Sequence, residues 1–111
     1  SRIDLSKYEG NVLIVVNSAA ASASDTLDFA VVESTTASGS GTAVPADALF
    51  NVTTGANATF TQVTDAAASF QVVALNLERV SRYIRVNATS AGASGVSIAF
   101  SVAVVGANKT V

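Results

Sequence analysis

Apolar and polar residues alternate along much of this chain, and the alternation predicts strands rather than helices. The clearest stretch runs from Val96 to Val105, where large apolar side chains take every second position. A period of two places the two sets of side chains on opposite faces of a strand. We therefore expect one face of this last strand to pack against a core and the other to contact small side chains or solvent. The second face consists of Ser97, Ala99, Ser101 and Ala103.

Other stretches carry related patterns. Val12–Val16 is a continuous apolar run, which is typical of a strand covered on both faces. Ser69–Leu77 alternates, so we expect Val73 and Leu75 to share a face opposite Phe70. The remaining predicted strands are Leu27–Glu33, Leu49–Val52, Ala58–Val63 and Arg82–Thr89.

The connections are rich in Gly, Ser, Asn and Asp, and no run suits a long amphipathic helix. Residues 34–42 have the composition of a flexible loop, and Pro45 opens either one helical turn or an irregular segment, which we favour. These signals predict an all-β, single-domain antiparallel β-sandwich of seven or eight strands, with a jelly roll as one option for its strand order. We expect an N-terminal arm at residues 1–10, the sandwich at 11–106 and a tail at 107–111.

Composition supports one folded domain. The chain has 111 residues, of which 50% are hydrophobic and 13% charged, and such a balance argues against disorder. The net charge of −2 gives no basic surface for nucleic acid or an anionic membrane. The first ten residues lack the apolar stretch of a signal peptide, and no apolar run is long enough to span a bilayer. We therefore expect neither a nucleic-acid nor a membrane partner.

Catalytic chemistry has few candidates in this sequence. There is no Cys and no His, which removes disulfides, thiol nucleophiles and the usual zinc and haem ligands. A Ser–Lys pair would depend on Lys7 or Lys109, both near the termini. Most of the aspartates lie in predicted turns, where Asp commonly bonds to nearby backbone amides. We expect no enzymatic activity, no metal and no cofactor.

Positive charge concentrates between residues 78 and 85, which hold half of the lysines and arginines. On a strand, Tyr83 and Arg85 share one face while Ile84 points to the core. This cluster either binds a partner, since Tyr and Arg are common in interface hot spots, or its arginines pair with Glu78, Glu33 or Asp28 on a solvated surface. The candidate partner-interface residues are Lys7, Tyr8, Arg79, Arg82, Tyr83, Arg85, Ser97, Ala99 and Ser101.

Four motifs occur in an order that resembles the capsid decoration (cement) proteins of tailed bacteriophages. The motifs are Leu5-Ser6-Lys7-Tyr8-Glu9-Gly10, Leu27-Asp28-Phe29-Ala30-Val31-Val32-Glu33-Ser34, Ala58-Thr59-Phe60-Thr61-Gln62-Val63-Thr64 and Arg82-Tyr83-Ile84-Arg85-Val86. The likeness extends from about Leu5 to Gly106. The chain departs from that family in its longer 35–48 insert and its lack of Trp.

The resemblance implies a β-sandwich on the outer surface of an HK97-type capsid, where it binds the major capsid protein and stabilises contacts between capsomers. It also implies a homo-oligomer on the capsid surface and synthesis in the cytoplasm of a bacterial host. Two alternatives remain open. One is another virion component, such as a tail or head–tail joining protein, and the other is a cell-surface carbohydrate-binding or adhesion sandwich. Sugar platforms usually need exposed Trp or Tyr, and Tyr8 and Tyr83 are the only two such residues here.

Overall fold

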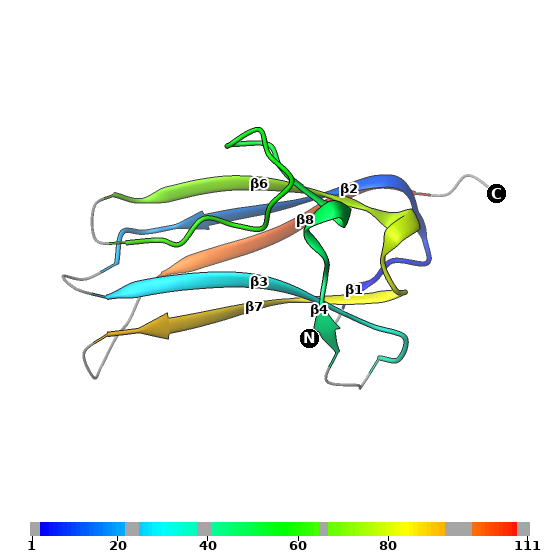
Figure 1. Cartoon of the computed structure of the whole chain (residues 1–111), viewed down its shortest axis with the longest axis horizontal. Helices are drawn as coiled ribbons and strands as arrows, with labels where there is room; N and C mark the ends of the chain where they lie inside the picture. Colours follow the sequence, from blue (N-terminus) through cyan, green and yellow to red (C-terminus); the bar gives the residue numbers. More distant parts are fainter. Residues whose placement is uncertain (1–2, 22–24, 38–40, 65–66, 93–98, 109–111) are drawn as a thin grey trace.

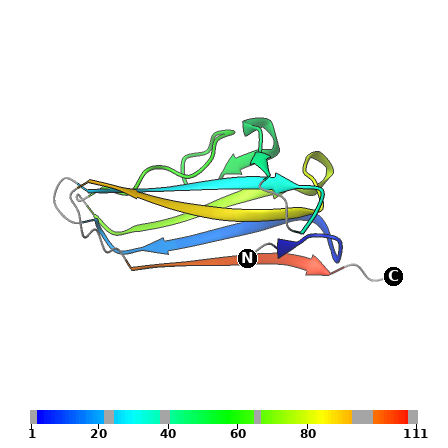
Figure 2. The same ribbon diagram turned by 90° about the horizontal axis from the view of Figure 1, so that it is seen from below.

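The computed structural model describes residues 3–21, 25–37, 41–64, 67–92 and 99–108, and it is a sandwich of two antiparallel sheets (Figures 1 and 2). The principal extents are 49 × 30 × 21 Å, and the long strands run along the longest of them. The expected all-β sandwich is confirmed. Its jelly-roll variant is not confirmed by the observed strand order.

Each sheet has four strands within the described residues. The first sheet has the order β1 (Ile3–Asp4), β7 (Tyr83–Ala91), β3 (Thr26–Ser34) and β4 (Thr42–Ala43). The second sheet has the order β5 (Leu49–Asn51), β6 (Ser69–Asn76), β2 (Tyr8–Ser18) and β8 (Phe100–Asn108). Two short 3-10 helices, η1 (Ala46–Ala48) and η2 (Leu77–Arg79), complete the described elements.

The core lies between the inner faces of the two sheets and consists of small, stiff side chains. Ile14 of β2, Val73 of β6 and Ile84 of β7 are completely buried there. The alternation expected for β6 is confirmed, because Val73 and Leu75 are buried while Phe70 points outward and is 62% exposed. Branched side chains with few rotamers lose little entropy on packing in such a layer.

The run Val12–Val16 lies in β2, but the expectation that it is covered on both faces is wrong for a single chain. Val12, Ile14 and Val16 are fully buried on the inner side of the second sheet, and Ile14 and Val16 belong to the core cluster. Leu13 is 38% exposed and Val15 is half-buried, because no third layer covers the outer face of the second sheet in the described part of the chain.

The predicted strand at Ala58–Val63 is not a regular strand. Only Val63 forms a bridge, to Leu27 at the edge of β3, with backbone hydrogen bonds of 2.8 and 2.9 Å. The segment before it crosses from the edge of the second sheet to the edge of the first, and buried Phe60 lies edge-on against Phe29 at 6.0 Å. Because this segment closes the gap between two sheets, it does not extend either of them.

The region around Pro45 combines the two options that the sequence left open. Pro45 precedes the single turn η1, as Pro at a helix start favours, and η1 leads directly into β5. The short strand β4 pairs with β3 at Val32 and Glu33, so part of the insert at 35–48 extends the first sheet.

The termini of the described chain belong to the sheets. Ile3 and Asp4, in the segment expected as an arm, pair with β7, and Leu5 is buried in the core. The last strand, β8, begins at Phe100 and continues to Asn108, while Val96, Ser97 and Ile98 lie outside the described residues. Within β8 the expected alternation is confirmed. Val102 and Val104 pack against the core, and Ser101 and Ala103 are exposed on the opposite face.

Candidate binding surfaces

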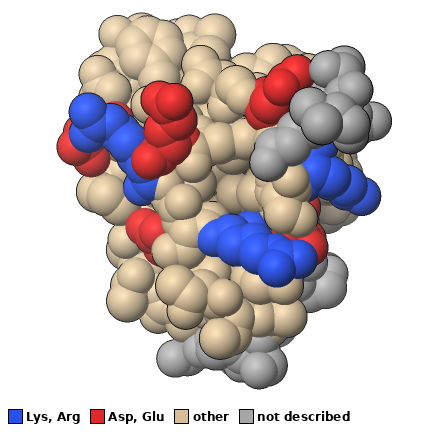
Figure 3. Space-filling view, turned by 90° about the vertical axis from the view of Figure 1, so that its right-hand side faces the viewer, with Lys and Arg blue, Asp and Glu red and all other residues tan. Residues whose placement is uncertain are grey.

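Charged side chains gather at the end of the sandwich where the β1–β2 turn, η2 and the start of β7 meet (Figure 3). We call this surface the charged end. Its members are Asp4, Lys7, Glu9, Glu33, Asp47, Glu78, Arg79 and Arg82. Acidic and basic side chains are interspersed, so this end does not carry a strong electrostatic potential of a single sign.

A bidentate ion pair joins β1 to the residue before β7. Arg82 donates from Nε to Asp4 Oδ1 at 3.0 Å and from Nη2 to Asp4 Oδ2 at 2.9 Å. These bonds, with help from the Ser6 backbone amide, hold the pKa of Asp4 well below its usual range. The same pairing raises the pKa of Arg82. The pair therefore fixes the N-terminal strand to the first sheet.

The arginines find other partners than those considered from the sequence. Arg79 donates to Asp47 of η1 at 2.9 Å, and Arg82 pairs with Asp4. Glu33 instead accepts from the backbone amide and hydroxyl of Ser81, at 2.8 and 3.0 Å. The alternative in which these arginines pair with Glu78, Glu33 or Asp28 is thus wrong for Arg79 and Arg82. The true partners lie in η1 and β1, far from the cluster in sequence.

Both tyrosines lie at the charged end, and each has a cation over its ring. The Lys7 ammonium is 5.8 Å from the centroid of Tyr8, and the Arg82 guanidinium is 5.1 Å from that of Tyr83. Tyr8 also borders a groove of about 460 Å³ that Glu9 and Glu78 line with carboxylates. Of the sequence-predicted interface residues, Lys7, Tyr8, Arg79, Arg82 and Tyr83 are thus brought together.

Arg85 lies farther along β7, on the outer face of the first sheet. Its register partner on β3 is Val32, and its Nε is buried with no hydrogen-bond partner among the described residues. The arginine is half-buried, so its aliphatic stem covers the sheet.

The predicted small-residue face lies at the other end of the molecule. Ala99 precedes β8 and accepts a backbone hydrogen bond from Ala19 at 2.9 Å, and Ser101 pairs with Asn17. Both are exposed, and Ser97 lies outside the described residues. The structure therefore divides the sequence-predicted interface into two separate surfaces.

Sequence reasoning missed the largest of the candidate surfaces, which we call the apolar face. It is the outer face of the second sheet, where strand register aligns side chains in rows across four strands. One row contains Phe50, Ala74, Leu13 and Val105, and the next contains Val52, Val72, Val15 and Ala103.

Polar residues without charge border these rows on two sides. Asn11 and Asn76 lie at one end of the rows, and Asn17 and Ser101 lie at the other. Phe70, which pairs with Asn17, is an apolar residue within this border. Several of the apolar side chains are strongly exposed, namely Val105 (55%), Val52 (51%), Phe50 (41%) and Leu13 (38%). The small Ser/Ala face of β8 is one margin of this surface, and only the register of the neighbouring strands shows the rest.

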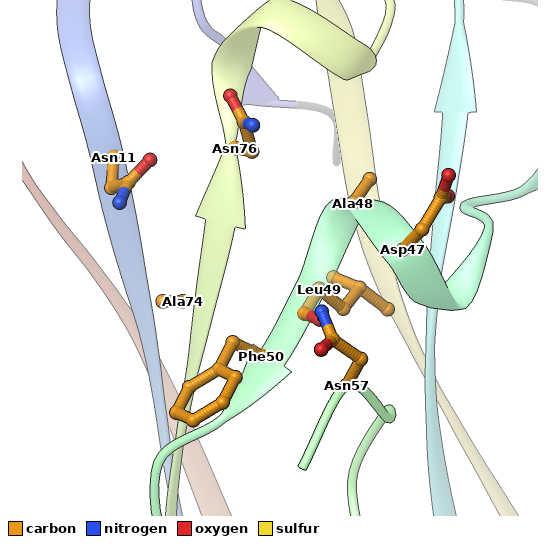
Figure 4. A pocket seen from close by; sticks show the side chains of 8 residues that line it. All are labelled: Asn11, Asp47, Ala48, Leu49, Phe50, Asn57, Ala74 and Asn76. Carbon is orange, nitrogen blue, oxygen red and sulfur yellow. The ribbon is translucent and has the colours of Figure 1, made fainter. Parts of the chain in front are cut away.

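A small polar hollow of about 190 Å³ lies beside the apolar face (Figure 4). Asn11, Asn76, Asn57 and Asp47 line it together with Phe50. Most of these polar groups already serve the fold. Asn57 donates to the Leu49 carbonyl, Asn76 accepts from the Glu78 amide and Asp47 holds Arg79.

Within residues 3–21, 25–37, 41–64, 67–92 and 99–108, no three His, Cys, Asp or Glu side chains come together to hold a metal ion. No helix in that part of the chain is long and apolar enough to cross a membrane. No family model, curated protein or solved structure matches this chain.

Proposed function

We propose that this protein is a structural component of a tailed-phage virion that decorates the outer surface of an HK97-type capsid and reinforces contacts between capsomers. The role is one of binding, with no catalytic step. The proposed partner is the major capsid protein, and the resemblance of four ordered motifs to decoration proteins supports this choice.

The charged end is the observation that carries the proposal. It brings together, from three separate chain segments, two tyrosines with cations over their rings and a groove bordered by carboxylates. Tyr and Arg are enriched at the energetic centres of protein interfaces. A surface with charges of both signs fixes the register of one complementary partner and disfavours other partners. We assign the capsid contact to this end.

The test is cosedimentation of the purified protein with expanded empty shells. We expect binding at a fixed stoichiometry, and Tyr83→Ala weakens it by about tenfold or more because a hot-spot side chain is removed. Thr89→Ala is the matched control, since Thr89 lies on the same outer face of β7 but away from the charged end and is exposed. Failure of the unchanged protein to sediment with expanded shells overturns the proposal.

A carbohydrate-binding role is the second candidate, because the hollow in Figure 4 places Asn amides beside an exposed phenyl ring. Amides and a ring face are the groups that hold sugar hydroxyls and C–H edges. We rank it second because Asn57, Asn76 and Asp47 are already bonded within the fold. Saturable glycan binding together with absent shell binding would replace the capsid proposal by this one.

A further inference from the structure

The apolar face is a continuous exposed surface across all four strands of the second sheet. With strands about 4.8 Å apart and a rise of about 3.4 Å per residue, each outward position takes about 33 Å², so the two apolar rows cover about 260 Å² and about 420 Å² with the five border residues. The largest apolar patch on a typical monomer is about 300–600 Å² and often functional. In Figure 2 two of its strands, β2 and β8, run along the lower side of the body, opposite β3 and β7.

The sequence of β2 is that of a strand with cover on both sides. Val12, Ile14 and Val16 are buried on the inner side of the second sheet, while no described layer of the same chain lies above Leu13 and Val15. The outer face of the first sheet differs. There Asp28, Arg85 and Asn87 lie in the corresponding outward positions of β3 and β7. Only one of the two outer faces is thus built like a core surface.

We propose that the apolar face packs against the same face of a second copy of this chain, giving a two-fold symmetric dimer. A dimer of this kind buries about 850 Å² in total, which is in the range of weak, transient interfaces. No charged residue lies in the two apolar rows, although Glu9 and Asp47 lie just beyond their Asn11–Asn76 end. A net charge of −2 per copy opposes pairing only weakly.

The strand register lets the apolar rows of two copies superimpose. An axis parallel to the strands places β5 over β8 and β6 over β2 of the other copy, row upon row. Phe50 then faces Val105, Leu13 faces Ala74 and Val52 faces Ala103, so in these three pairs a larger side chain meets a smaller one. In the fourth pair Val15 faces Val72. Stacked sheets interdigitate in this way at a spacing of about 10 Å.

The other in-plane axis, perpendicular to the strands and between the two apolar rows, also places apolar side chains on apolar ones. Leu13 then faces Val15, and Val105 faces Ala103 of the other copy. The two arrangements differ in where the charged ends lie. The parallel axis brings both charged ends to the same end of the dimer, and the perpendicular axis places them at opposite ends.

Sedimentation equilibrium over a range of protein concentration tests the dimer without any capsid. We expect a monomer–dimer equilibrium with a dissociation constant on the order of micromolar, given the modest area. Ala103→Glu buries two charges per dimer and weakens association by about tenfold or more. Ala30→Glu is the matched control, because Ala30 is also an exposed, outward-facing strand alanine but lies on the first sheet. We expect it to leave association unchanged.

The orientation has its own test. The chain has no cysteine, so Lys7→Cys offers a single site for a spin label at the charged end. The parallel axis predicts a label-to-label distance well below the 49 Å length of one copy, whereas the perpendicular axis predicts one near or beyond it.

Three results would overturn this inference. They are a monomer at all concentrations up to about 1 mM, a dimer that persists in Ala103→Glu, or closed assemblies larger than a dimer. A monomer whose shell binding is abolished by Ala103→Glu would assign the apolar face to the capsid protein instead. Because self-association is measured without shells, its outcome is independent of the proposed capsid role.

Discussion

Buried polar side chains hold the irregular segment between β5 and β6 in place of strand pairing. Gln71 is 4% exposed, accepts from the Thr61 amide at 2.7 Å and donates to the Thr61 carbonyl at 2.9 Å. Asn51, almost wholly buried, donates to the Thr59 carbonyl and accepts from the Thr54 amide. These amides supply the donors and acceptors that a neighbouring strand would otherwise supply.

Gln71→Leu should therefore lower the free energy of unfolding by about 1–3 kcal/mol, because two backbone groups of Thr61 lose their partner. Urea unfolding gives this quantity from the shift of the midpoint. Gln62→Leu is the matched control, since Gln62 is exposed and, within the described part of the chain, its side chain bonds to Asp28 alone, on the surface. We expect it to change stability by less than about 0.5 kcal/mol. Equal effects of the two substitutions would contradict the role given to Gln71.

The Asp4–Arg82 pair predicts a titration rather than a large stability effect. Arg82→Gln removes the bidentate partner, so the pKa of the Asp4 carboxyl should rise toward its usual value of about 3.9. Carboxyl carbon NMR shifts measure it directly. Arg79→Gln should leave it unchanged, because Arg79 pairs with Asp47. An Asp4 pKa that does not respond to Arg82→Gln would show that the pair does not form in solution.

The sign of the pH dependence follows from the direction of that shift. The pKa of Asp4 is lower in the folded protein than in an unfolded chain. The pair therefore stabilises the folded state in full above about pH 4, the usual pKa of Asp in an unfolded chain, and this contribution is lost as the pH falls from there through the lowered pKa of folded Asp4. Backbone amide shifts of β1 should show this loosening on acidification, and Arg82→Gln should remove it.

Elements with regular alternation were predictable from the sequence, and the elements that close the sandwich were not. The alternation in β3, β6 and β7 located these strands within a few residues, because the pleat fixes which side chains are buried. The continuous apolar run Val12–Val16 located only the middle of β2, which extends from Tyr8 to Ser18. Residues 58–63 carry the same local pattern, yet they form a crossing strap. Their conformation depends on Gln71 and Asn51, whose contacts are not visible in a local pattern.

Phe60 anchors that strap, and its ring can be compared with a second ring on the same partner. Phe60 and Phe100 both lie edge-on against Phe29, at 6.0 and 5.3 Å, but Phe60 is 7% exposed and Phe100 is 46% exposed. Phe60→Ala should cost about 3–4 kcal/mol through lost burial and a cavity, and Phe100→Ala about half as much. Thermal or urea unfolding separates them. A larger loss from Phe100→Ala would mean that the strap is dispensable.

At the scale of the whole molecule, the candidate surfaces depend on long-range pairing that the sequence only partly reveals. The cluster between residues 78 and 85 identified the charged end, but its partners Asp4 and Asp47 come from β1 and η1. The Ser/Ala pattern of β8 identified one margin of the apolar face. The rest of that face required the register that brings β5, β6 and β2 beside it, and register is set by pairing across the chain.

The two proposals together make a prediction that neither makes alone. A dimer with its axis parallel to the strands presents two charged ends in the same direction. Both copies can then bind the same shell at the same time. Bivalent attachment raises apparent affinity by about 100-fold or more when the spacing of the sites fits. Ala103→Glu should therefore weaken shell binding by that factor at concentrations where the unchanged protein is dimeric, although Ala103 is outside the charged end.

Tyr83→Ala should show the opposite separation, with weakened shell binding and an unchanged monomer–dimer equilibrium, because Tyr83 lies on the first sheet. Ala30→Glu should change neither property. Titrating labelled protein onto expanded shells, beside sedimentation equilibrium of the same samples, measures both quantities for each variant. If Ala103→Glu became monomeric yet bound shells as tightly as the unchanged protein, each copy would attach alone. The dimer would then be a state of the free protein, because a second charged end adds affinity only when both ends reach the same surface.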